Sequence, residues 1–144
     1  MNKSNSIYHN VPINASVEKV FKAISAPEEL EKWWPQKCIG IPELGAVYNF
    51  YFGEAYNWYG EVIEYKENVS FYIKMTKSDK DWNPTTFGFD LQMKGGETYL
   101  QFFHKDWPEI NTHFKHSSFC WAMLLNGLKN YLEKGIIIPF SKRE

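Results

Sequence analysis

The sequence predicts an α+β fold in which a curved antiparallel sheet packs against a long C-terminal helix. Three observations predict it: an apolar stripe of helical period near the N-terminus, a middle section with a period of two residues, and a final helical stripe of about twenty residues. Because strands are grouped together and not alternated with helices, we expect the helices to cover one face of an antiparallel sheet. The length of 144 residues suits one domain, residues 1–144.

The composition excludes several classes of function. With 16 basic and 17 acidic residues, a formal charge of −1 and no basic stripe, the chain is not expected to bind nucleic acid. It has neither a signal-peptide pattern nor an apolar run long enough for a membrane span, so a cytoplasmic location is the default expectation. Cys38 and Cys120 lack further thiols at metal-ligand spacing, so we expect both to be reduced and buried, with no cofactor.

The N-terminal part predicts a strand and two short helices. Residues 7–13 alternate loosely, and Pro12 favours a position at the edge of the sheet. Residues 17–24 carry an apolar stripe of helical spacing, and Ser16 is placed to cap that helix. Pro27 suits the first turn of a second helix, which we expect to end in a pair of tryptophans.

The middle of the chain predicts a run of strands. Turn residues separate them, among them Gly95–Gly96, a pair typical of a two-residue hairpin loop, so neighbouring strands run antiparallel. A helix over Thr112–Lys134, with Gly135 as its C-cap, completes the chain. The predicted strands are Val47–Phe52, Trp58–Tyr65, Val69–Lys77, Thr85–Lys94 and Glu97–His104.

Five segments carry motifs that resemble those of one known family. They are Ile13–Ile24 (INASVEKVFKAI), Pro27–Trp34 (PEELEKWW), Gly60–Glu64 (GEVIE), Thr98–His104 (TYLQFFH) and Trp121–Leu132 (WAMLLNGLKNYL). Together they resemble the Activator-of-Hsp90-ATPase-homologue (AHSA1) branch of the START/Bet v 1-like (SRPBCC) helix-grip superfamily, over nearly the whole chain. The resemblance implies one strand, two helices, five strands and a helix. Ala26, Pro35 and Cys120 depart from the family pattern, so the ligand cannot be carried over.

Alternate residues of the predicted strands place a mainly aromatic set toward the long helix. If the sheet curves away from the helix, as the family's does, these rings line a hollow; if the helix lies flat on the sheet, they are ordinary core packing. His104, Tyr48, Ser117 and Ser118 are the polar candidates to orient a ligand. The residues expected to contact a ligand are Trp33, Trp34, Tyr48, Phe50, Trp58, Phe71, Phe87, Phe89, Phe102, His104, Ser117, Trp121 and Leu125.

The histidines have two interpretations each. His104 at the end of a strand can transfer protons, but a satisfied core histidine is the preferred interpretation, because no nucleophile with a base is evident, and no catalytic residue is assigned. His113 and His116 can share a metal with Asp106 or Glu109. We expect no metal there, because a structural zinc site normally needs four good ligands.

Three further features have a structural and a functional interpretation. Trp33 and Trp34 can form an aromatic lid on the cavity or can seal the open end of the sheet. Residues 105–108 are expected to form an exposed loop that gates the cavity or only connects two elements, with Trp107 at its centre. Gly127, inside the long helix, allows a close approach of sheet or ligand, or relieves crowding below a bulky neighbour.

Three functions follow from these observations. The first is a non-catalytic carrier or sensor of a small apolar, aromatic or lipid-like molecule, as a monomer or homodimer. The second, implied by the resemblance, is an Hsp90 co-chaperone-like domain that stimulates the ATPase in a stress response, although the family's eukaryotic namesake has an additional N-terminal domain. The third, also implied by relatives, is an enzyme resembling polyketide cyclases and dehydratases. We choose the first, since it needs only a lined hollow.

Overall fold

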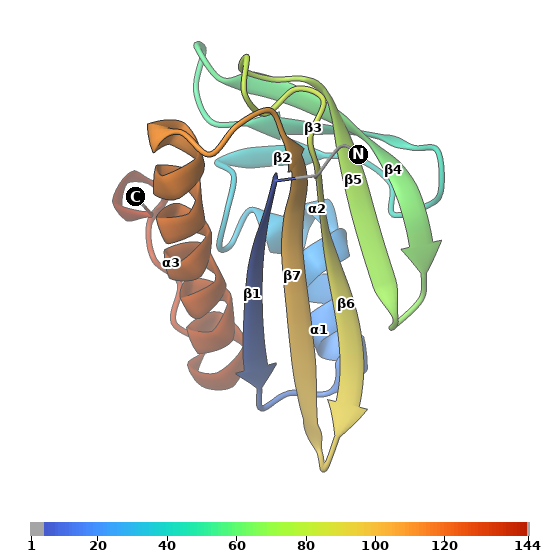
Figure 1. Ribbon diagram of the computed structural model, residues 1–144. Helices are drawn as coiled ribbons and strands as arrows, with labels where there is room; N and C mark the ends of the chain where they lie inside the picture. Colours follow the sequence, from blue (N-terminus) through green and yellow to red (C-terminus); the bar gives the residue numbers. More distant parts are fainter. Residues whose placement is uncertain (1–4, 144) are drawn as a thin grey trace.

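The computed structural model describes residues 5–143 and has the predicted α+β architecture (Figure 1). Its single sheet has seven strands, all paired antiparallel, in the order β1-β7-β6-β5-β4-β3-β2. The elements are β1 (Asn5–Ile13), α1 (Val17–Ser25), α2 (Pro27–Leu30), β2 (Lys37–Ile39), β3 (Val47–Tyr51), β4 (Asn57–Lys66), β5 (Ser70–Lys77), β6 (Thr86–Lys94), β7 (Glu97–Trp107), α3 (Thr112–Lys134) and a 3-10 turn, η1 (Phe140–Lys142).

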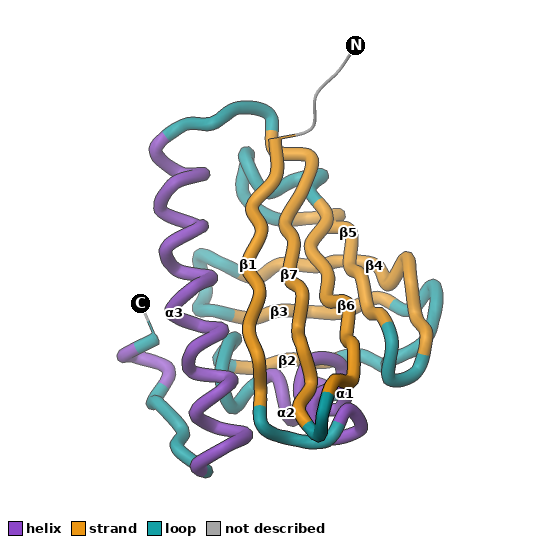
Figure 2. The backbone as a smooth tube through the Cα atoms, turned by 60° about the horizontal axis from the view of Figure 1, so that its bottom comes forward, coloured by secondary structure: helices purple, strands orange, loops and turns teal. Residues whose placement is uncertain are grey.

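The sheet is strongly curved, and α3 runs beside its edge strand β1. Figure 2 shows β2 and β3 crossing the direction of β1 and β7 in that view, while α1 and α2 lie at one end. β1 is an edge strand, as Pro12 predicted, because proline lacks an N–H group for a second neighbour. The β6–β7 turn is the predicted hairpin: Gly95 and Gly96 have φ values of 58° and 85°, in the left-handed region that glycine adopts without strain.

Local capping sets the helix ends where the sequence indicated. The Ser16 hydroxyl accepts a hydrogen bond from the Lys19 N–H at 3.2 Å, which satisfies a donor that has no partner within the first turn of α1. Asn111 caps α3 in the same way, accepting from the Phe114 N–H at 2.9 Å. At the other end of α3, Gly135 is left-handed and its N–H donates to carbonyls of the last turn.

The core fills most of the space between sheet and helices. Strand residues of the predicted inward set are buried ring against ring, and α3 buries one stripe against them. Tyr48 is fully buried and its hydroxyl donates to the Ser25 carbonyl at 2.5 Å, so the packed side of the sheet also satisfies its polar groups. The α3 stripe comprises Ser117, Trp121, Leu125, Leu128 and Leu132.

Several expectations were wrong in detail. β2 was missed because a strand of three residues has too few positions to show a period. α2 ends at Leu30, and the tryptophan pair lies in the turn that follows it. Residues 105–107 continue β7 and do not form an exposed loop; Trp107 is only 3% exposed. The strand extends there because β1 pairs with it as far as the Asn5–Trp107 pair.

One further expectation, and one of the two interpretations of Gly127, need correction. Cys120 was expected to be buried but is half-buried, since its side of α3 faces a pocket and not the sheet. At Gly127 no close approach exists: an added Cβ would meet only the Ile138 Cδ1 atom at 3.9 Å, an ordinary contact distance. Among residues 5–143, no helix is both long and apolar enough to cross a membrane.

Candidate ligand-binding site

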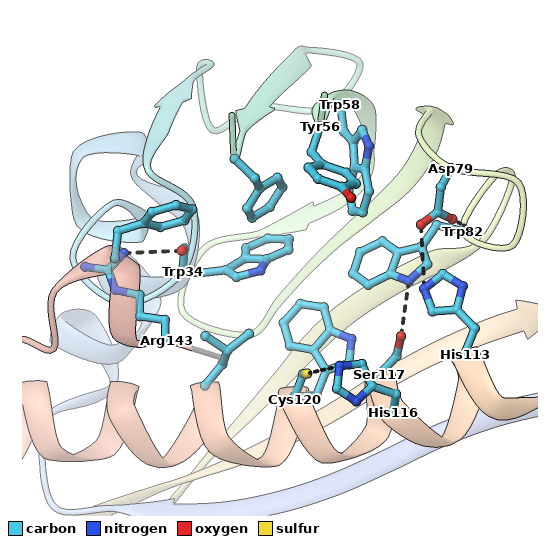
Figure 3. Close-up of a pocket in the computed structure, with 14 residues that line it drawn as sticks. Trp34, Tyr56, Trp58, Asp79, Trp82, His113, His116, Ser117, Cys120 and Arg143 are labelled. Carbon is cyan, nitrogen blue, oxygen red and sulfur yellow. Dashed lines mark hydrogen bonds and ion pairs between the residues drawn. The ribbon is translucent and has the colours of Figure 1, made fainter. Parts of the chain in front are cut away.

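A pocket of about 410 Å³ lies between the N-terminal half of α3 and the far strands of the sheet (Figure 3). Its walls come from α3, from the β3–β4 hairpin, from the connection between β5 and β6, from the turn after α2 and from the C-terminal segment. The lining residues are Trp34, Phe52, Tyr56, Trp58, Asp79, Trp82, His113, His116, Ser117, Cys120, Trp121, Leu124, Phe140 and Arg143.

One face of α3 forms the longest wall. Its lining residues fall at positions 113, 116, 117, 120, 121 and 124, a spacing of three and four residues that puts their side chains on one side of a helix. Figure 3 shows the labelled members of this row projecting toward the aromatic side chains above them. The helix therefore presents both the polar and the apolar groups of one wall.

Five aromatic rings form a closed circuit of contacts around the pocket. Starting at Trp34, ring centroids are 5.6 Å apart to Phe52, 5.2 Å from Phe52 to Trp58, 4.9 Å from Trp58 to Trp82, 5.9 Å from Trp82 to Trp121, and 4.8 Å from Trp121 back to Trp34. Such pairs each contribute about 0.5–1.5 kcal/mol beyond the area that they bury. Since the five rings support one another, the apolar wall is formed before any ligand arrives.

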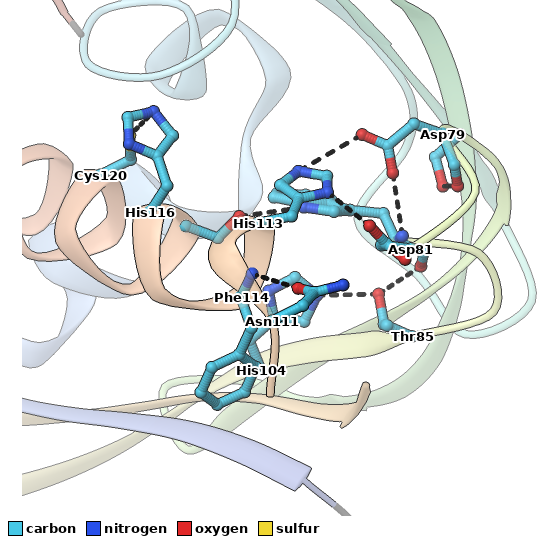
Figure 4. Close-up of polar contacts among 12 residues, drawn as sticks. Asp79, Asp81, Thr85, His104, Asn111, His113, Phe114, His116 and Cys120 are labelled. Carbon is cyan, nitrogen blue, oxygen red and sulfur yellow. Dashed lines mark hydrogen bonds and ion pairs between the residues drawn. The ribbon is translucent and has the colours of Figure 1, made fainter. Parts of the chain in front are cut away.

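His104 supports this wall from behind and does not line the pocket. The indole N–H of Trp121 donates to His104 Nδ1 at 3.1 Å. An indole only donates, so Nδ1 is unprotonated and the proton lies on Nε2, which is 2.8 Å from Thr85 Oγ1 and donates to it. The Thr85 hydroxyl in turn donates to the Trp82 carbonyl (Figure 4). Three hydrogen bonds thus connect the Trp121 ring to the backbone carbonyl of Trp82.

Burial keeps this imidazole neutral. It lowers the pKa of His104 to about 3, because the charged form would lose its water, and the nearby charge of His113 acts in the same direction. Both ring nitrogens already have partners. A neutral, fully bonded histidine holds the Trp121 ring and the Trp82 backbone in place and does not change its protonation state near neutral pH.

A polar cluster of His113, Asp79 and Asp81 lies at one end of the pocket. His113 Nδ1 is 2.9 Å from Asp81 Oδ2, and its Nε2 is 3.6 Å from Asp79 Oδ2 (Figure 4). One turn further along α3, Cys120 Sγ is 3.4 Å from His116 Nε2. In the structure His113 contacts Asp79 and Asp81, and His116 contacts Cys120. Among residues 5–143, no group of three or more His, Cys, Asp or Glu side chains is placed to hold a metal ion.

Of the residues that we expected to contact a ligand, some line the pocket and others lie in the core. Trp34, Trp58, Ser117 and Trp121 line the pocket. Trp33 borders a smaller hollow of about 40 Å³ under the C-terminal segment, and its indole N–H donates to the Ala23 carbonyl. The others lie in the core away from the pocket, and their contact with a ligand stays a prediction: Tyr48, Phe50, Phe71, Phe87, Phe89, Phe102, His104 and Leu125.

Sequence reasoning missed several lining residues. Trp82 carried a usable signal, because a lone tryptophan in the polar connection 78–84 has no reason to be there unless it packs against something. Tyr56, Asp79 and Phe140 come from loops and the C-terminal segment, where no period exists. Nothing in the sequence indicated that Arg143 lines the pocket.

A curved antiparallel sheet closed over a long C-terminal helix, with a pocket at one end, defines a protein of the helix-grip fold. The family model described as Activator of Hsp90 ATPase homolog 1-like protein (AHSA1) matches residues 14–133, so the chain belongs to this family. This confirms the resemblance inferred from the motifs. No match was found among curated proteins.

Solved structures agree with this assignment. The chain is similar to the Aha1 dimer from Colwellia psychrerythraea, with a TM-score of 0.83 and 26% identity over 91% of this chain and 98% of that one. Protein MLL2253 from Mesorhizobium loti has a TM-score of 0.80 and 17% identity over 92% of this chain and all (100%) of that one. CalU16 from Micromonospora echinospora has a TM-score of 0.75 and 17% identity over 92% and 78% of the two chains. The last two show the fold alone.

Proposed function

We propose that this protein binds a small, largely apolar or aromatic molecule in the pocket beside α3, as a carrier or sensor without chemistry of its own. The closed circuit of Trp34, Phe52, Trp58, Trp82 and Trp121 is the observation that carries the proposal. Aromatic faces offer large contact areas that ring-shaped or acyl ligands bury, at about 25 cal/mol per Å² of apolar surface before ordering costs.

The size and composition of the pocket support this function. Its volume of about 410 Å³ lies in the range of small-molecule sites, roughly 300–1,000 Å³. Most of the lining residues are aromatic or apolar, as in sites that use apolar walls for affinity and isolated polar atoms for orientation. The hydrogen bonds from His104 to Thr85 and from Trp121 to His104 fix ring positions in advance, which reduces the entropy lost on binding.

The direct test uses the tryptophans of the pocket as reporters. Fatty acids, flavonoids and aromatic metabolites are titrated while tryptophan emission and the melting temperature are followed. A ligand of the folded state quenches the emission and raises the melting temperature by mass action. Failure of a broad panel to change either quantity would contradict the proposal. Native mass spectrometry of protein purified from its own host then detects any molecule that co-purifies.

A matched pair of tyrosine variants localises the effect. Tyr56 lines the pocket and is 55% exposed, so Tyr56→Ala removes a wall group at little cost in stability. Tyr8 is 73% exposed on β1 and does not line the pocket, so Tyr8→Ala is the control. We expect weaker binding only in the first variant. Equal affinities in both variants would place the ligand elsewhere.

A second candidate function is protein interaction of the co-chaperone kind. Four apolar residues on β2, on β3 and in the turn between them are exposed: Ile39, Ile41, Leu44 and Val47. Exposed apolar groups beside an edge strand favour contact with another chain. The test is stimulation of the ATPase of purified Hsp90, with an Ile39→Ser, Leu44→Ser double variant for comparison. If a saturating concentration of this protein does not stimulate the ATPase, this candidate function is excluded. Sedimentation then tests whether the same exposed residues form a homodimer.

In the enzyme alternative, His113 replaces His104 as the candidate general base. His104 is neutral and bonded at both nitrogens, whereas His113 lines the pocket with Asp81 at 2.9 Å, an arrangement that can accept a proton. Mass spectrometry of a ligand after prolonged incubation separates the functions. An unchanged ligand supports binding alone. A modified ligand, formed by the native protein and not by a His113→Ala variant, would support catalysis.

A further inference from the structure

We infer that the ligand is an anion, specifically an aromatic carboxylate whose charged group is held at Arg143. The inference rests on the proposed function and adds a ligand class and an orientation. Arg143 follows η1 in the C-terminal segment and lines the pocket. In Figure 3 its guanidinium lies at the end of the pocket opposite Asp79 and His113, with the labelled aromatic side chains between the two ends.

Within residues 5–143, the hydrogen bonds of Arg143 go to uncharged acceptors. Its Nη1 donates to the carbonyl oxygens of Glu31, Trp34 and Pro35 at 2.9, 3.2 and 3.3 Å, and its Nε donates to the Ile138 carbonyl at 2.8 Å. No carboxylate within residues 5–143 forms an ion pair with it. The N–H groups of Nη2 make no hydrogen bond within the same range. Among residues 5–143, Nη2 therefore has no partner.

No anionic side chain of the described part of the chain compensates this partly desolvated positive charge. Burial lowers the pKa of Arg143, although a guanidinium stays protonated in proteins. A charge that has lost water gains more from an anion than an exposed charge does. A carboxylate fits the planar guanidinium through charge-assisted hydrogen bonds, which are stronger than neutral ones.

The distribution of charge in the rest of the pocket sets the orientation. The acidic side chain in the lining, Asp79, accepts a hydrogen bond from the Trp82 N–H at 2.9 Å and lies 3.6 Å from His113. A ligand carboxylate at that end would face a like charge, whereas at the opposite end it meets Arg143. The aromatic body then lies along the five-ring circuit, and its far end meets the polar groups of Ser117 and His116.

The experiment compares an acid with its neutral ester. 2-Naphthoic acid and methyl 2-naphthoate share one ring system and differ in charge at neutral pH. By isothermal titration calorimetry and tryptophan quenching, we expect the acid to bind at least about tenfold more tightly than the ester. Added salt should reduce this ratio, because ions screen the pairing. An ester that binds as well as the acid refutes the inference and leaves the proposed function intact. Binding of neither, nor of any other panel member, refutes both.

Variants in the same segment assign the charge to one residue. Arg143→Gln removes the guanidinium, and Lys142→Gln makes the same change in charge at the neighbouring position, which does not line the larger pocket. We expect the acid-to-ester ratio to fall toward one in Arg143→Gln and to persist in Lys142→Gln. If both variants keep the ratio, the inference is wrong.

A third variant separates the charge of Arg143 from its structural role. Its bonds to Glu31, Trp34 and Pro35 tie the C-terminal segment to the end of α2, so Arg143→Gln can lose affinity for both ligands by loosening that segment. Arg143→Lys keeps the charge. If the acid preference persists in Arg143→Lys, the inference is supported. If it disappears there while the melting temperature is unchanged, the positive charge is not what selects the ligand and the inference is overturned.

Discussion

Replacing His104 by glutamine tests whether burial holds this imidazole neutral. Glutamine reproduces the bonding of the neutral tautomer, since its carbonyl can accept from the Trp121 indole and its amide can donate to Thr85, but it does not titrate. The variant will lose some stability through its different shape. The informative quantity is how the difference in unfolding free energy between wild type and variant changes with pH.

The sign follows from the two pKa values of His104. Its folded-state pKa of about 3 lies below the ordinary histidine pKa of 6.5, which applies in the unfolded chain. Above about pH 6.5 neither state binds the proton, and the contribution to stability is fully present. As the pH falls below about 6.5, the unfolded chain binds a proton that the folded chain refuses, so wild-type stability decreases by up to about 1.4 kcal/mol per pH unit until the folded pKa is reached.

Between about pH 8 and about pH 5 this linkage amounts to a loss of about 2 kcal/mol in the wild type relative to His104→Gln. Any folded-state pKa below about 4 gives nearly the same figure, so the expectation depends only on the imidazole staying neutral at about pH 5. Urea unfolding followed by circular dichroism at both pH values measures it, and carboxylate titrations cancel in the difference. A difference that does not change with pH would show that the folded imidazole protonates freely.

The remaining predictions concern packing and thiol accessibility. Gly127→Ala should raise the unfolding free energy by up to about 1 kcal/mol, because a methyl group meets only ordinary contacts inside α3; Gly88→Ala should lower it, because its Cβ would lie 2.4 Å from the Tyr72 ring. Urea midpoints check both, and equal shifts would contradict the argument. Burial raises the pKa of Cys38 to about 12, so iodoacetamide should leave Cys38 unmodified until unfolding and react first at Cys120 in the pocket wall. Peptide mapping checks this order.

The order of elements was predictable because it depends on local chemistry. Ser16 and Gly135 mark helix ends through hydrogen bonds and backbone conformations that involve only near neighbours. The period of two residues also identified the side of each strand that is buried; Phe71 and Phe87 are inward in the structure as expected. β2 and the end of β7 were beyond such reasoning, because a three-residue strand and the pairing of Asn5 with Trp107 depend on partners distant in sequence.

The sequence by itself determined which rings point inward, and only the tertiary structure decided which of them border empty space. Phe89 and Trp58 have the same strand environment in the sequence, yet the first is enclosed by other rings and the second faces the pocket. The difference arises because the curvature of the sheet brings neighbours from separate elements against one ring and not the other. Arg143 shows the same limit: its place in the wall is set by carbonyl groups more than a hundred residues away (|i−j| of 108 to 112), which no local pattern encodes.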